Sequence, residues 1–171
     1  MFRLGTTGQK CLKGLHLIAV ACWIGGGVAL VLLYFLKPGA GPNDGVLYGV
    51  NQAAHHVDTW VVVIPGAFGC LLTGLAYSLF TGWGFLRHGW IALKWAVTLG
   101  AIAFGTVCLG PWERGMMDIS GRMGMAALGD PAYLRDEWLN LTWGAAQVVL
   151  LMAVVFISIF KPWKNLGKRK G

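Results

Sequence analysis

The fold of this chain is decided by the stretch Leu15–Leu36, which reads LHLIAVACWIGGGVALVLLYFL. It carries no full charge, and its length is close to the ~20 residues that take a helix across a ~30 Å hydrocarbon core. A helix on the surface of a soluble protein has one apolar and one polar face, whereas this stretch is apolar nearly all round. The stretch therefore predicts a helix that is surrounded by lipid.

Three further runs have the same character, namely Trp60–Phe80, Ile91–Leu109 and Leu141–Phe160, and Lys94 is the single full charge inside the four runs. With 171 residues and a hydrophobic content of 56%, the chain has no room for a second, soluble domain. We expect an all-α polytopic membrane protein, in which residues 1–171 form one membrane domain. The domain is predicted to be a four-helix transmembrane bundle, with helices at about 14–36, 57–80, 89–109 and 139–160.

The net charge of +7 gathers beside the apolar runs rather than on one soluble face, which argues against a nucleic-acid partner. Basic residues precede the first run, separate the second from the third and follow the fourth: Arg3, Lys10, Lys13, Arg87, Lys161, Lys164, Lys168, Arg169 and Lys170. The other two connections mix basic with acidic residues. By the positive-inside rule, both termini are predicted to be cytoplasmic.

His16 is the sharpest candidate for chemistry, because an ionisable side chain inside a membrane helix is costly and usually faces a partner, a cavity or a cofactor. It lies about one turn inside the cytoplasmic end of the first predicted helix, before Gly25 and Gly26. An imidazole can be an axial ligand of haem iron, and a glycine face would leave room for the flat macrocycle. The ordinary alternative is a His that bonds to a neighbouring helix, with glycines that permit close packing.

Two further residues are expected at the depth of His16. His88 begins the third helix on the same side, where it would be either a second axial ligand or an interfacial polar residue. Lys94 lies about one turn inside that helix, and its ammonium would either bind a haem propionate or snorkel to the headgroups. The predicted cofactor site therefore consists of His16 on the haem iron with His88, Lys94, Gly25 and Gly26.

An alternative metal site is predicted on the outer side of the membrane. His55 and His56 are adjacent at the start of the second helix, and Met116 and Met117 lie in the connection that follows the third. Imidazole and thioether ligands suit copper, particularly Cu(I). The competing interpretation is that the methionines pack or face lipid.

The stretch Leu12–Gly26 resembles the first-helix signature shared by several bacterial membrane families, with His16, then Trp23 seven positions later and then a pair of small residues. These families include the haem-dependent membrane protoporphyrinogen oxidases (HemJ-like) and the copper-resistance membrane proteins (CopD-like). The stretches Leu71–Gly74 and Trp83–Trp90 are more similar to bacterial four-helix membrane proteins of unknown function. In the oxidases a Trp-x-x-x-Lys motif, similar to Trp90 with Lys94, opens a later helix. The resemblance implies that His16 binds haem together with this Lys. The oxidases also have a His late in that helix, where this chain reads FGTV at 104–107, so the resemblance supports a haem site rather than the oxidase reaction.

Three functional hypotheses follow, all for a multi-pass protein of a bacterial cytoplasmic (inner) membrane in contact with the lipid bilayer. The leading hypothesis is a protein that binds b-type haem and exchanges electrons with a membrane redox partner. The second is a component that handles or transports copper or another metal. The third is a small non-catalytic membrane subunit whose polar residues are structural. The sequence leaves enzymatic activity and oligomeric state open.

Overall fold

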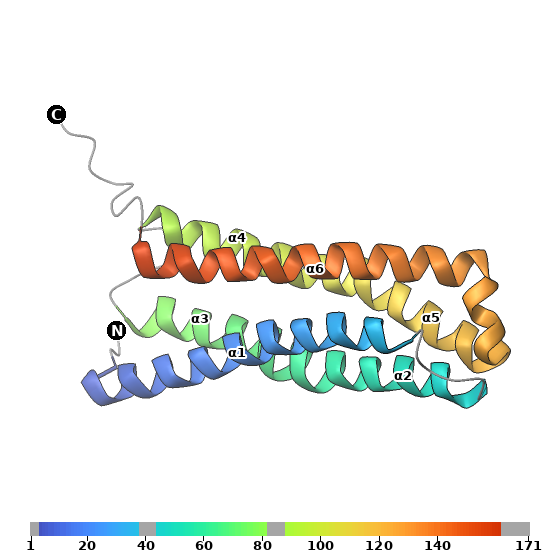
Figure 1. Cartoon of the computed structure of the whole chain (residues 1–171). Coiled ribbons are helices and arrows are strands. Elements are labelled where there is room, and N and C mark those ends of the chain that lie inside the picture. Colours follow the sequence, from blue (N-terminus) through green and yellow to red (C-terminus); the bar gives the residue numbers. More distant parts are fainter. Residues whose placement is uncertain (1–3, 38–43, 82–87, 162–171) are drawn as a thin grey trace.

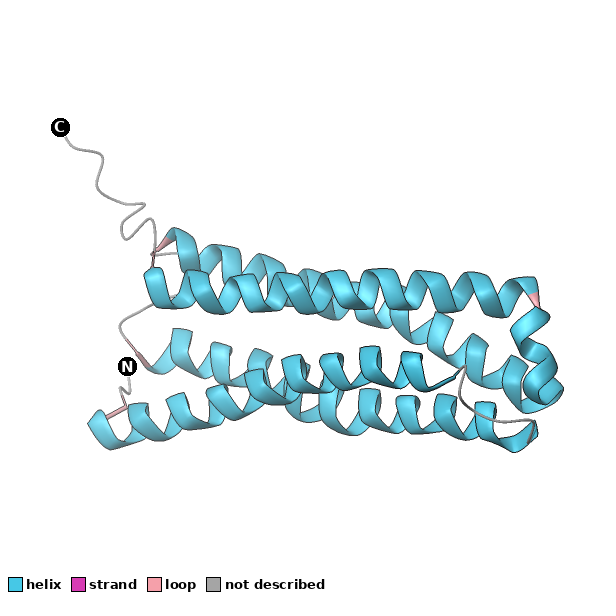
Figure 2. Ribbon diagram, in the orientation of Figure 1, coloured by secondary structure: helices cyan, strands magenta, loops and turns pink. Residues whose placement is uncertain are grey.

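The computed structural model describes residues 4–37, 44–81 and 88–161, and the regular structure in these ranges is helical (Figure 2). The helices form four long spans (Figure 1). The first span is α1 (Thr6–Leu36), and the fourth is α6 (Pro131–Phe160). The second and third are composite. The second span joins α2 (Asp44–Val57), the π-helix η2 (Asp58–Phe68) and α3 (Gly69–Phe80). The third span joins α4 (Gly89–Phe104), the π-helix η3 (Gly105–Leu109), α5 (Gly110–Met123) and the 3₁₀-helix η4 (Gly124–Gly129).

Each span is long and apolar enough to cross a membrane. The helices that contain the spans have 31, 36, 41 and 30 residues, whereas ~20 apolar residues suffice for a crossing. Large apolar side chains cover the outside of the bundle, where a soluble protein would be polar; Leu15, Leu17 and Ile18, for example, are each more than half exposed. These observations confirm the predicted all-α bundle of four apolar helices.

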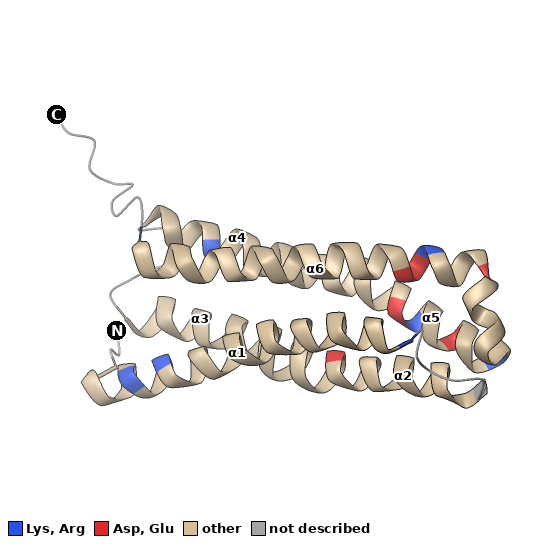
Figure 3. Ribbon diagram, in the orientation of Figure 1, with Lys and Arg blue, Asp and Glu red and all other residues tan. Residues whose placement is uncertain are grey.

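The start of α1 and the end of α6 lie at the same end of the bundle (Figure 1). At this end the backbone N–H of Leu4 donates to the carbonyl oxygen of Phe80 at 3.1 Å, so the start of α1 lies beside the end of α3. We call it the basic end, because the acidic side chains in the described residues gather toward the opposite, acidic end (Figure 3). The basic tail predicted after Lys161 lies outside the described residues.

The helices are longer than the apolar runs predict. The second span begins at Asp44 instead of about residue 57, and the fourth begins at Pro131 instead of about residue 139. These added turns are amphipathic, and they pack on one another at the acidic end. Leu47 and Tyr133 of these turns pack with Met116 and Ile119 of α5 and Ala127 of η4, and the five buried side chains form a separate small core. The length of an apolar run does not detect such turns, because half of their residues are polar.

The third helix was predicted to end at about residue 109, but it continues through Gly110 and Pro111 into α5. The π-helix η3 lies directly before this point, and the backbone N–H of Gly110 donates to the carbonyl oxygen of Gly105, five residues earlier. A π-turn rearranges the hydrogen-bond ladder, and a proline with no N–H to donate is tolerated at the first turn of the helix that follows. Pro65 lies inside the other π-helix, η2.

The closest contact between spans joins α1 to η2. A Cβ added to Gly66 would lie 2.8 Å from Cα and 2.9 Å from the backbone nitrogen of Trp23, so the two backbones nearly touch. One turn further toward the basic end, a Cβ on Gly69 would lie 3.0 Å from the Cβ of Ala19. Lipid provides no hydrophobic force that drives helices together, so small residues that allow such close packing hold membrane helices in place.

Gly66→Ala is therefore expected to lower the stability of the bundle by about 1–3 kcal/mol, since its methyl group would have to displace backbone. Gly74→Ala is the matched control, because an added Cβ there meets no atom within 4 Å. Thermal unfolding of the two variants in detergent measures the difference. Equal melting temperatures would contradict a backbone contact at Gly66.

A polar cluster ties the spans together at the acidic end. The side-chain amide of Asn51 donates to Ser120 Oγ at 2.9 Å and to Tyr133 Oη at 3.2 Å, and all three side chains are almost fully buried. Beside them, Lys37 Nζ lies 3.1 Å from Glu137 Oε1. Burial lowers the pKa of the Lys37 ammonium, and the Glu137 carboxylate opposes this shift. The cluster joins the end of α1 and the first turns of α6 to α2 and α5.

Asn51→Ala is expected to cost about 1–3 kcal/mol of unfolding free energy, because it removes a buried hydrogen-bond donor from two hydroxyl groups. Gln52→Ala, at the exposed neighbouring position, should stay within about 0.5 kcal/mol of the parent protein. Denaturation of both variants in detergent micelles tests this. A loss of the same size in both would mean that the amide contributes nothing specific.

Candidate functional site

A cavity of about 480 Å³ lies in the basic half of the bundle, between α1, α3 and α4. Its size falls in the range of pockets for small organic ligands, ~300–1,000 Å³. The residues that define its chemistry are His16, Cys70, Tyr77, Trp90, Lys94 and Thr98. We call it the His16 cavity.

The imidazole of His16 is held in one orientation by Thr73. His16 Nδ1 lies 2.7 Å from Thr73 Oγ1, and the same hydroxyl donates to the carbonyl oxygen of Gly69 at 2.6 Å. Because a hydroxyl has one hydrogen and Thr73 gives it to Gly69, its oxygen must accept from Nδ1–H of His16. The Nε2 atom then carries the lone pair, which is the form of imidazole that ligates a metal ion. The ring of Tyr77 meets the imidazole edge-on, with a centroid separation of 6.1 Å.

The His16 cavity is strongly basic. Lys94 Nζ lies 5.8 Å from the centroid of the Trp90 ring, and three more lysines, Lys10, Lys13 and Lys161, also line the cavity. No Asp or Glu is among the described residues that line it. Such a concentration of one sign of charge around an aromatic and apolar floor favours an amphipathic ligand with acidic groups.

The structure places the other predicted cofactor residues elsewhere. His88 directly precedes α4, and its ring stacks on Trp90 at a centroid separation of 6.3 Å, outside the residues that line the His16 cavity. A Cβ added to Gly26 would lie 2.6 Å from Val62 Cγ2, so this glycine serves the contact between α1 and η2. Gly25 is exposed and has no neighbour within 4 Å of the position of an added Cβ. Of the five predicted residues, His16 and Lys94 share one cavity.

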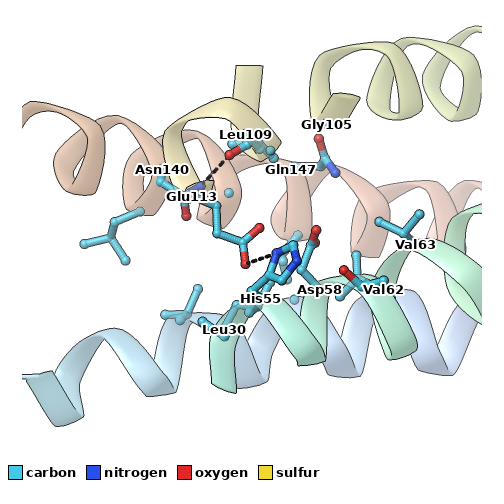
Figure 4. Close-up of a pocket in the computed structure, with 18 of the residues that line it drawn as sticks. Leu30, His55, Asp58, Val62, Val63, Gly105, Leu109, Glu113, Asn140 and Gln147 are labelled. Carbon is cyan, nitrogen blue, oxygen red and sulfur yellow. Dashed lines mark hydrogen bonds and ion pairs between the residues drawn. The ribbon is translucent and has the colours of Figure 1, made fainter. Parts of the chain in front are cut away.

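A second cavity, of about 350 Å³, lies in the acidic half between the four spans (Figure 4). Aliphatic and aromatic side chains line much of it, and polar groups gather toward the acidic end. The polar groups include His55, Asp58, Glu113, Asn140 and Gln147. We call it the Glu113 cavity.

His55 and Glu113 face each other across this cavity (Figure 4), with 3.7 Å between His55 Nδ1 and Glu113 Oε1. Both atoms are buried and have no hydrogen-bond partner, and Glu113 as a whole is 8% exposed. The carboxyl group of Asp58, one turn after His55, lies within hydrogen-bonding reach of the Glu113 carboxyl.

The four residues predicted for copper do not converge. His55 turns toward Glu113, whereas His56 is exposed and its ring centroid is 6.2 Å from that of His55. Met116 is buried, with its sulfur 3.7 Å from Lys37 Nζ, and Met117 is half-buried. Within the described residues, no three His, Cys, Asp or Glu side chains are close enough together to hold a metal ion. A copper site therefore stays a prediction.

Comparison of the chain with protein-family models, with curated proteins and with solved structures finds no match. The resemblance of the first helix to the HemJ-like and CopD-like families stays a prediction from its residues. The geometry of the two cavities is thus the basis for a functional proposal.

Sequence reasoning missed Thr73 and Glu113. Thr73 is a small polar residue in an apolar run, and a hydroxyl there usually bonds to its own helix. Glu113 follows Gly110 and Pro111, where the third helix was expected to have ended, so it was assigned to a connection. The sequence offered one indication for each residue. Thr73 is a polar residue inside an apolar run, and Glu113 is an acidic residue about one turn beyond the end of another.

Proposed function

We propose that this is an integral membrane redox protein that holds a b-type haem in the His16 cavity. One observation carries the proposal: an imidazole with its Nε2 lone pair available lies in the same cavity as four lysines, without an acidic residue among the described lining side chains. The residues fit this ligand. A haem requires an axial ligand, apolar walls for its ring and cations for its two carboxylates, and the cavity supplies each of these.

His16 would be the axial ligand, and Thr73 fixes its tautomer and ring plane through the Nδ1–H bond. Lys94 would bind a carboxylate of the ligand, since its ammonium reaches the cavity beside Trp90. Leu17 and Ile91 would supply apolar walls, and the ring of Tyr77 contacts the imidazole. A bound haem would supply an iron that can take up and release one electron.

The proposed location is a bacterial cytoplasmic membrane, with the basic end facing the cytoplasm. Support for this orientation comes from the distribution of charge, since Lys10 and Lys13 lie at the basic end and the acidic residues gather at the other (Figure 3). In this orientation the His16 cavity lies in the cytoplasmic half of the membrane, so an electron-transfer partner would dock from that side.

Optical spectroscopy tests the cofactor. Protein expressed with an ample haem supply and purified in detergent should show a Soret band that shifts on reduction, and His16→Ala should lose it. His56→Ala is the matched control, because this His is exposed at the opposite end of the bundle, and it should keep the full band. A parent protein without a Soret band, or equal bands in the two variants, would remove the proposal.

The role of Lys94 is tested by haem titration. Lys94→Gln removes one charge-assisted hydrogen bond, worth about 1.5–3 kcal/mol, so the affinity for haem should fall by roughly ten-fold or more. Lys94→Arg retains the positive charge and should bind within a few-fold of the parent protein. Equal affinities of the Gln and Arg variants would show that this ammonium does not contact the ligand.

A further inference from the structure

Three ionisable side chains meet in the Glu113 cavity, and the proposed haem site uses none of them. Asp58 is the first residue of η2 and His55 lies one turn before it, while Glu113 is in the first turn of α5. Figure 4 shows the three side chains converging from the second and third spans. Two carboxyl groups within hydrogen-bonding reach of each other are unusual inside an apolar bundle, and their contact needs an explanation.

Glu113 is the residue at this site whose charge most needs compensation. The residue is more than nine-tenths buried, lines the cavity, and leaves Oε1 without a hydrogen-bond donor. The imidazole of His55 is 3.7 Å away, which is too far for a hydrogen bond. A buried ionised carboxylate that lacks donors is strongly unfavourable, so either a cation or a proton must compensate it.

The charges around this site do not cancel by themselves. Lys37 at the end of α1 is paired with Glu137 of α6. Arg114 of α5 also lines the cavity and offsets one carboxylate. One proton, held by His55 or by the carboxyl groups, leaves a single negative charge on these three side chains, and the Arg114 guanidinium offsets that charge.

We propose that Asp58 and Glu113 form a proton-binding site, in which one proton is shared between the two carboxyl groups. A carboxylic acid can donate to a carboxylate, whereas two carboxylates at this separation repel each other. A metal ion is a poorer occupant, because the described residues provide no group of three suitable donors. The site lies in the acidic half, so the proton exchanges with water on that side of the membrane.

The Glu113 cavity supplies the path for exchange. Its volume of about 350 Å³ has room for several water molecules. Polar side chains that can hold water, including Asn140 and Gln147, share the cavity with the two carboxyl groups. From the acid pair the cavity continues inward to Trp23 and Leu151 in the apolar core, where a proton has no further acceptor. Proton exchange is therefore expected toward the acidic end, where the polar lining side chains gather.

Infrared spectroscopy of the full-length protein in detergent tests the proposal directly. A protonated carboxyl group has a carbonyl-stretch band that is separate from the bands of ionised carboxylates and moves in D₂O. The parent protein should show this band at neutral pH. Glu113→Gln and Asp58→Asn should each lose it, and Asp118→Asn, which changes an exposed acid on α5, should keep it.

Three results would overturn the shared proton, and each identifies an alternative. If the band appears only in His55→Gln, the proton in the parent protein resides on the imidazole. If it appears only when sodium is replaced by a bulky organic cation, a sodium ion occupies the site. A band that is present in the parent protein and unchanged in both the Glu113 and Asp58 variants would place the protonated acid elsewhere. None of these readouts depends on haem, so failure of the haem proposal leaves this test intact.

Discussion

The rest of the structure depends on the backbone contact between Gly66 and Trp23. Lipid is as apolar as the outside of the bundle, so apolar area does not select one helix arrangement over another, and close packing at small residues does. The contact fixes the register of α1 against the second span. Seven residues toward the basic end from this point lie His16 on α1 and Thr73 on α3, and these two meet in a hydrogen bond of 2.7 Å. The hydrogen bond that orients the His16 imidazole therefore depends on the close contact at Gly66, two helical turns away.

The two cavities divide the chemistry of the bundle by sign of charge. The His16 cavity has lysines and no described acidic side chain in its lining, whereas the lining of the Glu113 cavity includes the carboxyl groups of Asp58, Glu113 and Glu137. The apolar core around Trp23 and Val62 separates them. Ligands of opposite charge are therefore favoured in the two halves of one small protein.

The sequence predicts the fold well because apolar runs report directly on contact with lipid. It predicts helix ends poorly, because α2 and α5 are amphipathic and are stabilised by packing on each other, as Leu47 and Met116 do. For the candidate site, depth in the membrane places His16 and Lys94 at one level, and the structure puts them in one cavity. Depth does not give the direction in which a residue faces, so Gly26 was assigned to the cofactor although it packs on Val62. The contact of Asp58 with Glu113 joins residues far apart in the sequence, and no local pattern reveals it.

The placement of the two cavities in opposite halves has an energetic consequence for the cell. A charge that moves along the bundle axis between them crosses part of the transmembrane field, which is worth about 2.3 kcal/mol per elementary charge for each 100 mV across the full membrane. Electron uptake near one face and proton uptake near the other would therefore be electrogenic. The membrane voltage would then act on the occupancy of both cavities at once.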